Sequence, residues 1–413
     1  MERPVSPARP SHQRAESADF RLLWWAGAAD GIGSQASGTV LPLLLLQLGN
    51  SPQTVGLVAG VSTALGLLLG PFVALPADRG ARKRVMIGSA AVSALAMGCV
   101  ALALSTGRPP LGLILAAVLV ERVATACFEA AARGTVALVC PGPEQPRALA
   151  RLTAADQGAL VAGPALGGLL YQAARALPFL ADALSYVVSA LCVTAMRADL
   201  TAPAPREPGE GVLRESAAGL RLVRSSPLLR LVLVWGTTVN AVVVALYYGA
   251  VFTLQRDGRS GAVLGVILAL SGAAGLVGAL AAPNVAKRFG ASRVVTGVTW
   301  LLLPLAVTLA AVSDAWAYGL LFSLVCLLMP LASVVLQARA LQATAPALQA
   351  RTGAVLATAT TGAAALAPVL AGALADRVSP AAPAVFCGVL LTLLAAHSSR
   401  RPVRGVLTAE VSG

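Results

Sequence analysis

Residues 74–88 read ALPADRGARKRVMIG, a short polar stretch in a chain that is otherwise strongly apolar. Five charged side chains fall within seven positions, namely Asp78, Arg79, Arg82, Lys83 and Arg84. Long apolar runs with almost no charge lie before and after this stretch. A charged turn between two such runs is typical of a loop at a membrane surface, where basic residues determine on which side the loop stays.

The composition indicates the same class of protein. The chain has 413 residues, of which 57% are hydrophobic and 12% are charged, and its mean hydropathy is +0.78. Soluble domains are about 45–50% apolar and about 25% charged, so we predict a polytopic membrane protein. The net charge of +13 does not indicate nucleic-acid binding, because the basic residues recur as short groups between apolar runs and form no basic domain.

A membrane helix needs about 20 apolar residues, and the chain has twelve runs of about that length. The runs lie at about 21–47, 54–76, 85–105, 111–138, 152–174, 178–196, 228–253, 261–282, 294–312, 316–340, 351–374 and 381–397. We therefore predict an all-α membrane protein with twelve transmembrane helices.

The distribution of arginine and lysine predicts the orientation. If the N-terminus is cytoplasmic, 24 of the 31 basic residues lie in cytoplasmic segments, 5 lie in outer segments and 2 lie within a span. Basic residues are enriched on the cytoplasmic side of membrane proteins. We expect a multi-pass protein of the cytoplasmic membrane with both termini in the cytoplasm.

The longest polar connection begins with TAPAPREPGEG and predicts a flexible linker. After it, VLRESAAGLRLVRSSPLLR has apolar residues at helical spacing among arginines, which predicts an amphipathic helix on the inner leaflet. The expected organisation has five parts: a disordered cytoplasmic tail (1–20), a six-helix bundle (21–196), the linker with its amphipathic helix (197–227), a second six-helix bundle (228–397) and a C-terminal tail (398–413).

The two bundles resemble each other in sequence. Pro164 and Gly168 of the stretch AGPALGGLL correspond to Pro368 and Gly372, which are each 204 positions later. The stretch GLLLGP at 66 corresponds to GLVGAL at 275, with an offset of 209. These offsets predict a duplicated six-helix unit. Two such halves with a binding site between them are a transporter architecture.

These stretches resemble the major facilitator superfamily. ALPADRGARKR is similar to the charged loop between the second and third spans of that family, although Ala74 stands where the family prefers glycine. AGPALGG is similar to a sequence pattern of its exporters. FRLLWWAGAADGIGS, PFLADALSYVVSAL and ESAAGLRLVRSSPLLRL are similar to the twelve-helix branch that includes macrolide-efflux and enterobactin-exporter proteins. The resemblance covers about residues 20–397.

The resemblance implies a gate. Asp78 is expected to meet the cytoplasmic end of a helix of the other half, with arginines nearby, and to latch one state of the transporter. The gating residues that the resemblance implies are Asp78, Arg79, Arg82, Arg84, Gly163, Pro164, Gly167 and Gly168. A solvated loop that only determines topology is the alternative for the charged stretch.

Four polar residues of the first half are candidates for proton coupling or substrate binding. Asp30 and Gln35 lie within the first span. A buried charge is costly in a membrane and burial favours the protonated carboxyl, which suits a proton carrier. Arg122 lies midway along the fourth span and could pair with Asp30. Glu129 lies seven residues after Arg122 and could instead pair with Arg133, four residues further on.

A helix-end role is expected for Asp182, and Glu121 is expected to point away from Arg122. In the second half, Trp235 and Asn240 are substrate candidates, because aromatic and neutral polar groups suit a large amphiphilic ligand. Trp235 could equally be an anchor at the membrane interface. Spans 7 to 12 hold no deep acidic residue, so proton coupling is expected in the first half.

We therefore expect a secondary transporter that exports an amphiphilic small molecule, a drug or natural product, by proton antiport and alternating access. The alternatives are an importer or siderophore carrier on the same fold, and a membrane receptor or scaffold that transports nothing.

The sequence shows no pattern of a catalytic or metal site. The only histidines, His12 and His397, lie near the termini, and no nucleophile–base pattern or P-loop appears. We expect no enzyme activity, no metal or cofactor and no nucleic-acid partner, and we expect a monomer whose partners are substrate, protons and lipid.

Overall fold

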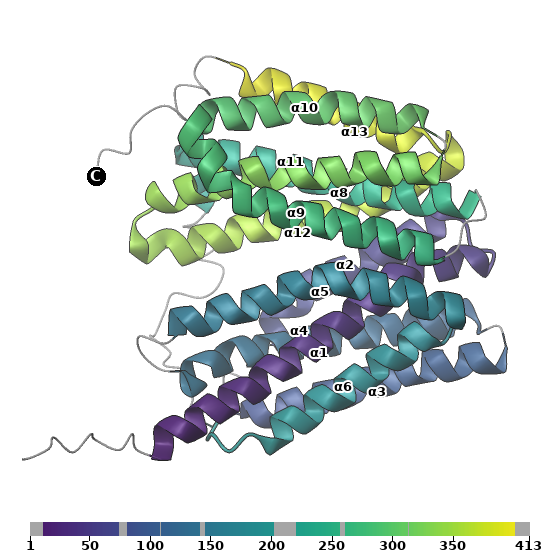
Figure 1. Cartoon of the computed structure of the whole chain (residues 1–413), viewed down its shortest axis with the longest axis vertical. Helices are drawn as coiled ribbons and strands as arrows, with labels where there is room; N and C mark the ends of the chain where they lie inside the picture. The colour runs from purple at the N-terminus through teal and green to yellow at the C-terminus, as the bar shows by residue number, and fades with distance from the viewer. Residues whose placement is uncertain are drawn as a thin grey trace, which may run out of the picture. The chain divides into compact units, whose positions relative to one another are not determined.

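The computed structural model describes residues 11–73, 81–107, 109–140, 145–201, 220–256, 261–312 and 314–400, and Figure 1 shows its helices. The labelled helices are α1 (Ser11–Gln47), α2 (Pro52–Val73), α3 (Arg82–Thr106), α4 (Leu111–Val139), α5 (Gln145–Ala173), α6 (Leu177–Ala195), α8 (Pro227–Arg256), α9 (Gly261–Phe289), α10 (Ala291–Ala311), α11 (Ala315–Gln342), α12 (Pro346–Arg377) and α13 (Ala382–Ser398). These ranges contain no strand, and the predicted all-α class is confirmed.

Each labelled helix overlaps one of the twelve predicted apolar runs, and their ends differ by up to ten residues. Within the described ranges, nine helices are long and apolar enough to cross a membrane by length and composition. The other three are α1, α5 and α13. The helix α13 has 17 residues, while α1 and α5 contain polar and small residues within their apolar runs, such as Asp30 and Gln35 in α1 and Asp156 in α5.

The predicted disordered tail is wrong for residues 11–20. These residues are helical and continuous with α1, because no proline or glycine interrupts the chain between Ser11 and the apolar run. The predicted linker and C-terminal tail lie mostly outside the described residues. Of the predicted amphipathic helix, residues 220–225 are described and are helical.

Contacts between Cα atoms divide the chain into two compact units. Unit 1 comprises residues 1–37, 68–163 and 176–206, and unit 2 comprises residues 38–67, 164–175 and 207–413. This division cuts through α1, α2 and α5, whereas the predicted halves divide at the linker. The cause lies within unit 2, where the end of α1, the start of α2 and the end of α5 pack on helices of the second half.

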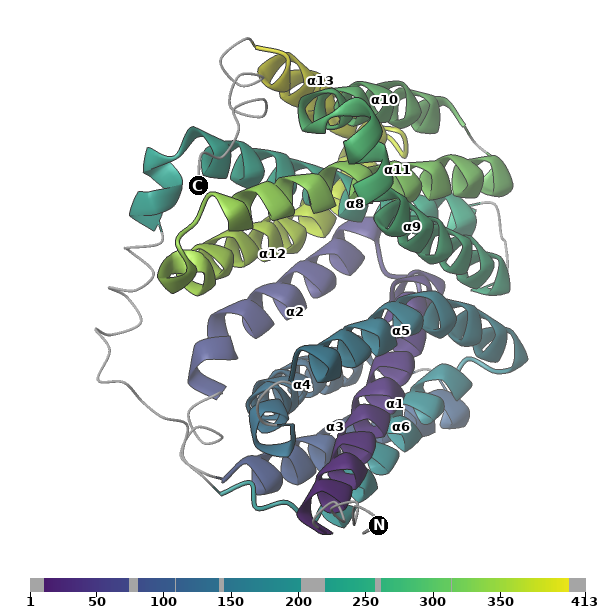
Figure 2. The same cartoon turned by 60° about the vertical axis from the view of Figure 1, so that its left-hand side comes forward.

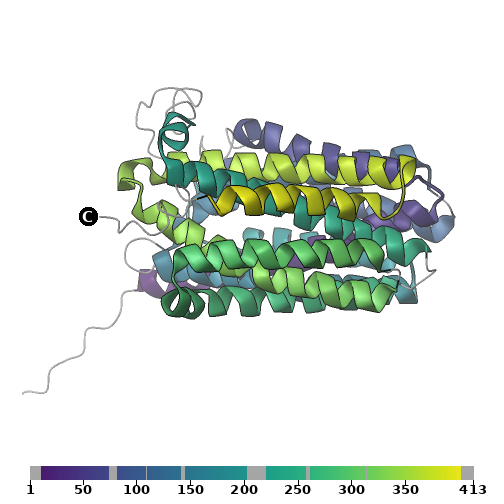
Figure 3. The same ribbon diagram turned by 90° about the horizontal axis from the view of Figure 1, so that it is seen from above.

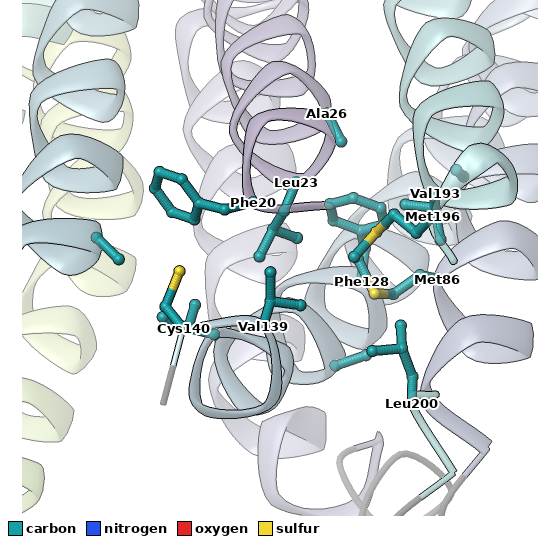
Figure 4. Close-up of a cluster of buried hydrophobic side chains, with 14 residues drawn as sticks. Phe20, Leu23, Ala26, Met86, Phe128, Val139, Cys140, Val193, Met196 and Leu200 are labelled. Atoms are coloured by element: carbon teal, nitrogen blue, oxygen red, sulfur yellow. The ribbon is translucent and has the colours of Figure 1, made fainter. Parts of the chain in front are cut away.

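An apolar cluster holds unit 1 together at the end where α1 begins. Phe20 and Leu23 of α1, Phe128 of α4 and Met196 beyond α6 are buried against one another there (Figure 4). Burying such side chains contributes about 1.5–3 kcal/mol each. Polar contacts close the same end: the Lys83 ammonium donates to the Met196 carbonyl oxygen at 2.7 Å.

Unit 2 is a bundle of helices that run side by side (Figure 3). Within it, α10 packs on α11 and α13, α11 on α9, and α12 on α8. The first part of α2 lies against the second part of α12 (Figure 2). The apolar faces that this packing leaves exposed, with Leu280 and Leu320 more than 70% exposed, are those that a membrane protein presents to lipid.

Two helix crossings of unit 2 repeat each other. A Cβ atom on Gly56 of α2 would overlap the backbone oxygen of Pro368 in α12. A Cβ atom on Gly265 of α9 would lie 2.6 Å from the backbone oxygen of Pro164 in α5. Gly56 and Gly265 are 209 positions apart and the two prolines are 204 apart, which are the offsets that the sequence repeat predicts. The six-helix repeat is confirmed at these crossings.

Candidate functional site

Three helices of unit 1 each place polar side chains on one face. On α1 these are Asp30, Ser34 and Ser37; on α6 they are Asp182, Tyr186 and Ser189; on α4 they are Glu121 and Thr125. The spacings are three or four residues, so the members of each set lie on the same side of their helix. All members of these sets are buried except Ser34, which is half-buried.

A tyrosine hydroxyl connects these three helices. Tyr186 is 2% exposed, and its hydroxyl donates to Glu121 Oε1 at 2.7 Å. Thr125 Oγ1 donates to the same carboxylate oxygen at 2.9 Å. Ser34 Oγ lies 2.9 Å from the Tyr186 hydroxyl. The network therefore satisfies Glu121 with two neutral donors and brings α1, α4 and α6 into one polar core.

Asp182 lies deep in this core rather than at a helix end, so the predicted helix-end role is wrong. It is 1% exposed, and Ser37 Oγ donates to its Oδ2 at 2.5 Å. The Oδ1 atom is buried and has no hydrogen-bond partner. Gly33 permits this arrangement, because a Cβ atom there would lie 2.9 Å from Asp182 Oδ1 and would overlap Ser185 Oγ.

Asp30 is 9% exposed and accepts no hydrogen bond from any residue in the described ranges. The carboxyl groups of Asp182, Glu121 and Glu129 lie near enough to interact electrostatically with it. No lysine or arginine of the described chain forms an ion pair with Asp30, Glu121 or Asp182. Carboxyl groups that are buried together without a paired cation are suited to holding and releasing protons.

The predicted pairing of Asp30 with Arg122 is not formed, because Arg122 is exposed on a different face of α4. Glu129 and Arg133 are exposed on the same face as Arg122 and form an ion pair at 3.4 Å, as predicted for that spacing. Glu121, expected to point away from Arg122, does so and enters the polar core. The opposite side of α4 exposes apolar residues such as Val120, so the helix has one polar and one apolar exposed face.

The second half contains a cavity of a different kind. The cavity has a volume of about 380 Å³ and lies in unit 2 between α8, α11 and α12. Its walls are mostly apolar, with a few neutral polar groups. The polar and aromatic lining residues are Trp235, Ser333, Gln337, Thr344, Gln349, Thr352 and Thr360. No acidic or basic side chain is among the residues that line it.

Trp235 and Asn240 are held by contacts inside unit 2. Trp235 is 2% exposed and its indole N–H donates to Thr299 Oγ1 at 2.9 Å, so Trp235 is a core residue rather than an interface anchor. The Asn240 amide donates to the Thr360 backbone oxygen at 2.9 Å. Trp235 contributes its ring to the cavity, whereas Asn240 ties α8 to α12 and is not among the lining residues.

Thr352 is the lining residue with an unused polar atom. It is 3% exposed, and its Oγ1 has no hydrogen-bond partner. An unsatisfied buried hydroxyl costs about 1–3 kcal/mol. A ligand in the cavity that offers a hydrogen-bond donor or acceptor would remove that cost.

The comparisons with known proteins agree with this architecture. Residues 23–368 match the family model described as Major Facilitator Superfamily. The chain belongs to the Major Facilitator Superfamily. It is therefore a multi-pass membrane protein of a transporter family, and transporters of this family act on small molecules. No curated protein sequence matches the chain.

Solved structures of the superfamily share the fold over most of the chain. The nucleoside transporter NupG has a TM-score of 0.72 at 12% identity, covering 96% of this chain and 100% of that one. A bacterial homolog of the human lysosomal transporter Spinster, in an inward-facing and unoccupied conformation, has a TM-score of 0.71 at 14% identity. The match covers 98% of each chain. A bacterial homologue of the iron transporter ferroportin, in an inward-facing state, has a TM-score of 0.67 at 17% identity. The match covers 94% of this chain and 99% of that one. At these identities the likeness establishes the fold alone.

In this superfamily member, the glycine-rich stretch of α5 packs on two sides. A Cβ atom on Gly163 would overlap Gln35 Cβ, so α5 approaches α1 closely at this point of unit 1. Pro164 lies against Gly265 in unit 2, while Gly167 and Gly168 are buried on the same helix. Gln35 thus packs with its Cβ against α5 and is half-buried.

Of the loop residues expected to form a gate, Asp78 and Arg79 lie outside the described residues. Arg82 is the first residue of α3, is 3% exposed and packs against Gly134 of α4 within unit 1. Arg84 is exposed in the first turn of α3. The part of the charged stretch that the structure describes is thus anchored to α4 by a buried arginine.

Sequence reasoning assigned no coupling role to Glu121, Asp182 or Tyr186, three residues at the centre of the polar core. A sequence gives the depth of an acidic residue along a predicted span, but it does not give the direction in which the side chain points. The spacing of four residues between Asp182 and Tyr186, and between Glu121 and Thr125, was the available signal. In an apolar helix, polar residues four apart indicate a shared buried partner.

Proposed function

We propose that this protein is a secondary transporter that exports an amphiphilic small molecule across the cytoplasmic membrane in exchange for protons. One observation carries the proposal: Asp30 is buried beside Asp182 and Glu121 and has no hydrogen-bond partner in the described chain. A carboxyl group in this setting is a natural proton carrier, because burial favours its protonated state and access of water favours its ionised state. Export is favoured by the resemblance of AGPALGG to the exporter pattern.

Proton release from Asp30 would change the relative free energies of the transporter's states. An ionised carboxylate within a membrane costs roughly 2.5–3.5 kcal/mol. A difference of about 1.4 kcal/mol changes an equilibrium tenfold. Ionisation would therefore favour whichever state admits water to Asp30 by roughly a hundredfold. Asp182 and its unpartnered Oδ1 are the second proton acceptor in this scheme.

The substrate would bind in the second half, where the cavity at Trp235 and Thr352 offers apolar walls and neutral polar groups. Such lining suits an amphiphilic drug or natural product and offers no charge to hold a strongly ionic one. Gln35, Arg122 and Glu129 of the first half would contact the substrate or relay protons. The proposed orientation keeps both termini in the cytoplasm and the protein monomeric.

Alternating access would be a rocking of residues 20–196 against 228–397. The crossings of Gly56 with Pro368 and of Gly265 with Pro164 would close the end of the bundle away from the termini. The charged loop, from Asp78 to Arg84, would close the other end. Pro164 and Gly168, which lie against Gly265, act in this scheme by permitting close contact with α9. This contact would form and break in each cycle.

Everted membrane vesicles provide the test. An acidic interior is generated by respiration, and a panel of amphiphilic dyes and drugs is added. Protons should leave the lumen as a substrate enters, and Asp30→Asn should abolish this efflux at matched expression. Asp199→Asn is the matched control, because it neutralises an exposed acid beyond α6 and should leave the efflux in place. Substrate uptake with no proton movement by the wild type would exclude proton antiport, and uptake in the opposite direction would identify an importer.

A further inference from the structure

A second cavity of about 690 Å³ lies in unit 1, along the seam between α1 and α5. The groove is separate from the polar core and from the cavity at Trp235. Its lining residues are Phe20, Arg21, Trp24, Trp25, Ala28 and Ile32 of α1, with Arg151, Ala154, Ala155, Gly158, Ala159 and Ala162 of α5.

The groove opens on the outside of the helix bundle. The face of α1 that carries Gly33 and Ser37 packs on α6, and Gly31 packs on Ala159 of α5. The groove residues lie beyond this seam, and Trp25 is 58% exposed there. In a superfamily member that spans a membrane, an exposed tryptophan on the outer surface of an apolar helix faces lipid.

Positive charge is confined to one end of the groove. Arg21 and Arg151 lie at the starts of the apolar runs of α1 and α5, and the rest of the lining is uncharged. The Trp24 indole N–H donates to the Arg151 backbone oxygen at 3.1 Å, which ties α1 to α5 at this end of the groove. No hydrogen bond or ion pair of either guanidinium occurs in the part of the chain that the structure describes.

The length of the groove matches one leaflet of a bilayer. Arg21 and Ile32 are eleven residues apart, as are Arg151 and Ala162. At 1.5 Å per residue each separation is roughly 16 Å. The hydrocarbon core of a bilayer is about 30 Å thick, so the groove spans about half of it.

We propose that the groove between α1 and α5 binds an anionic phospholipid. Its phosphodiester lies between Arg21 and Arg151, which can donate several charge-assisted hydrogen bonds to phosphate oxygens. One acyl chain lies along Trp25, Ala28 and Ile32, where Ala154 and Gly158 leave room for it. Basic pockets between helices at a membrane surface have the right chemistry for such headgroups. The inference does not depend on proton coupling or on the transported substrate.

The test uses quenching of tryptophan emission by brominated lipid. The full-length protein carries Trp300→Phe and Trp316→Phe, which remove two exposed tryptophans outside the groove. It is reconstituted in phosphatidylcholine vesicles that contain a small fraction of dibrominated phosphatidylglycerol or of dibrominated phosphatidylcholine. Two arginines at the interface should give roughly 30-fold preference for the anionic lipid, so quenching should saturate at a much lower fraction of it.

Arg21→Gln with Arg151→Gln should abolish that preference, while Arg21→Lys with Arg151→Lys should keep most of it. Arg175→Gln with Arg377→Gln is the charge-matched control and should quench as the parent does. Unchanged quenching by brominated phosphatidylcholine in all variants shows that they remain folded. Equal quenching by both lipids in the parent, or an unchanged preference in the glutamine pair, would overturn the proposal. Relief of quenching by inorganic phosphate would show a free-anion site instead.

Discussion

The two halves of this protein share a scaffold and differ in what they bury. The glycine–proline crossings at Gly56 and Gly265 repeat at matched offsets. Yet the first half buries Asp30, Glu121 and Asp182, whereas the cavity of the second half is lined by uncharged residues only. The two halves therefore share the contacts that let helices pack closely, whereas the residues that they bury in their interiors differ. We infer a division of labour, with protons handled in the first half and substrate in the second.

The largest expected effects come from the shared crossings. Gly56→Val and Gly265→Val should each reduce transport at least tenfold, because the new side chain meets a backbone carbonyl that cannot move aside. Overpacking of this kind costs about 1–3 kcal/mol. Transport assays and thermal unfolding in detergent would measure both effects.

Gly98→Val and Gly297→Val are the controls for the crossings, since nothing lies within 4 Å of a Cβ atom at either position. They should transport normally. If Gly56→Val abolished transport and Gly265→Val had no effect, the two crossings would not be functional equivalents.

The polar core should be the next most sensitive region. Tyr186→Phe removes a 2.7 Å donor to a buried carboxylate and should lower the free energy of unfolding by about 1–3 kcal/mol. Proton coupling should weaken as well, since the Glu121 carboxyl group loses a hydrogen-bond donor. Tyr247→Phe is the counterpart in the second half, where the hydroxyl donates to a backbone oxygen at 3.3 Å. Equal effects of the two changes on proton coupling would argue against a special role for the first half.

A smaller effect is expected at Thr352, where stability and substrate affinity should change in opposite directions. Thr352→Val removes a buried hydroxyl that has no partner, so the melting temperature should stay constant or rise. Substrate affinity should fall about tenfold if that hydroxyl bonds to the substrate. Equilibrium binding of a transported dye, measured beside the melting temperature, would separate the two. Unchanged affinity would remove Thr352 from the binding site.

The exposed pair on α4 should matter least. Arg133→Gln breaks an ion pair whose side chains are 72% and 52% exposed, and such pairs contribute about 0–1 kcal/mol. Denaturation midpoints of wild type and variant should agree closely. A loss of several kcal/mol would mean that the pair is buried in a state other than the one described.

Much of the fold could be predicted from the sequence, because runs of apolar residues determine where membrane helices lie. The repeat could be predicted as well, since Pro164 and Pro368 recur at a fixed offset. The site could be predicted only in part: Asp30 lies in the core, but Asp182 lies there too and was assigned to a helix end. Depth along a span can be read from a sequence, whereas the rotation of a helix depends on its neighbours. Gly33 decides that rotation by admitting α6 next to α1.

The most direct test of the division of labour is proton release on substrate binding. Purified protein in weakly buffered detergent solution is mixed with a transported dye, while a pH indicator reports released protons and fluorescence polarisation reports binding. Wild type should release protons as the dye binds, and Asp30→Asn should bind the dye within a few-fold of wild type without releasing them. A double variant with Asp30→Asn and Asp182→Asn should release no protons when it binds the dye. If it released as many protons as the wild type, the account would be contradicted.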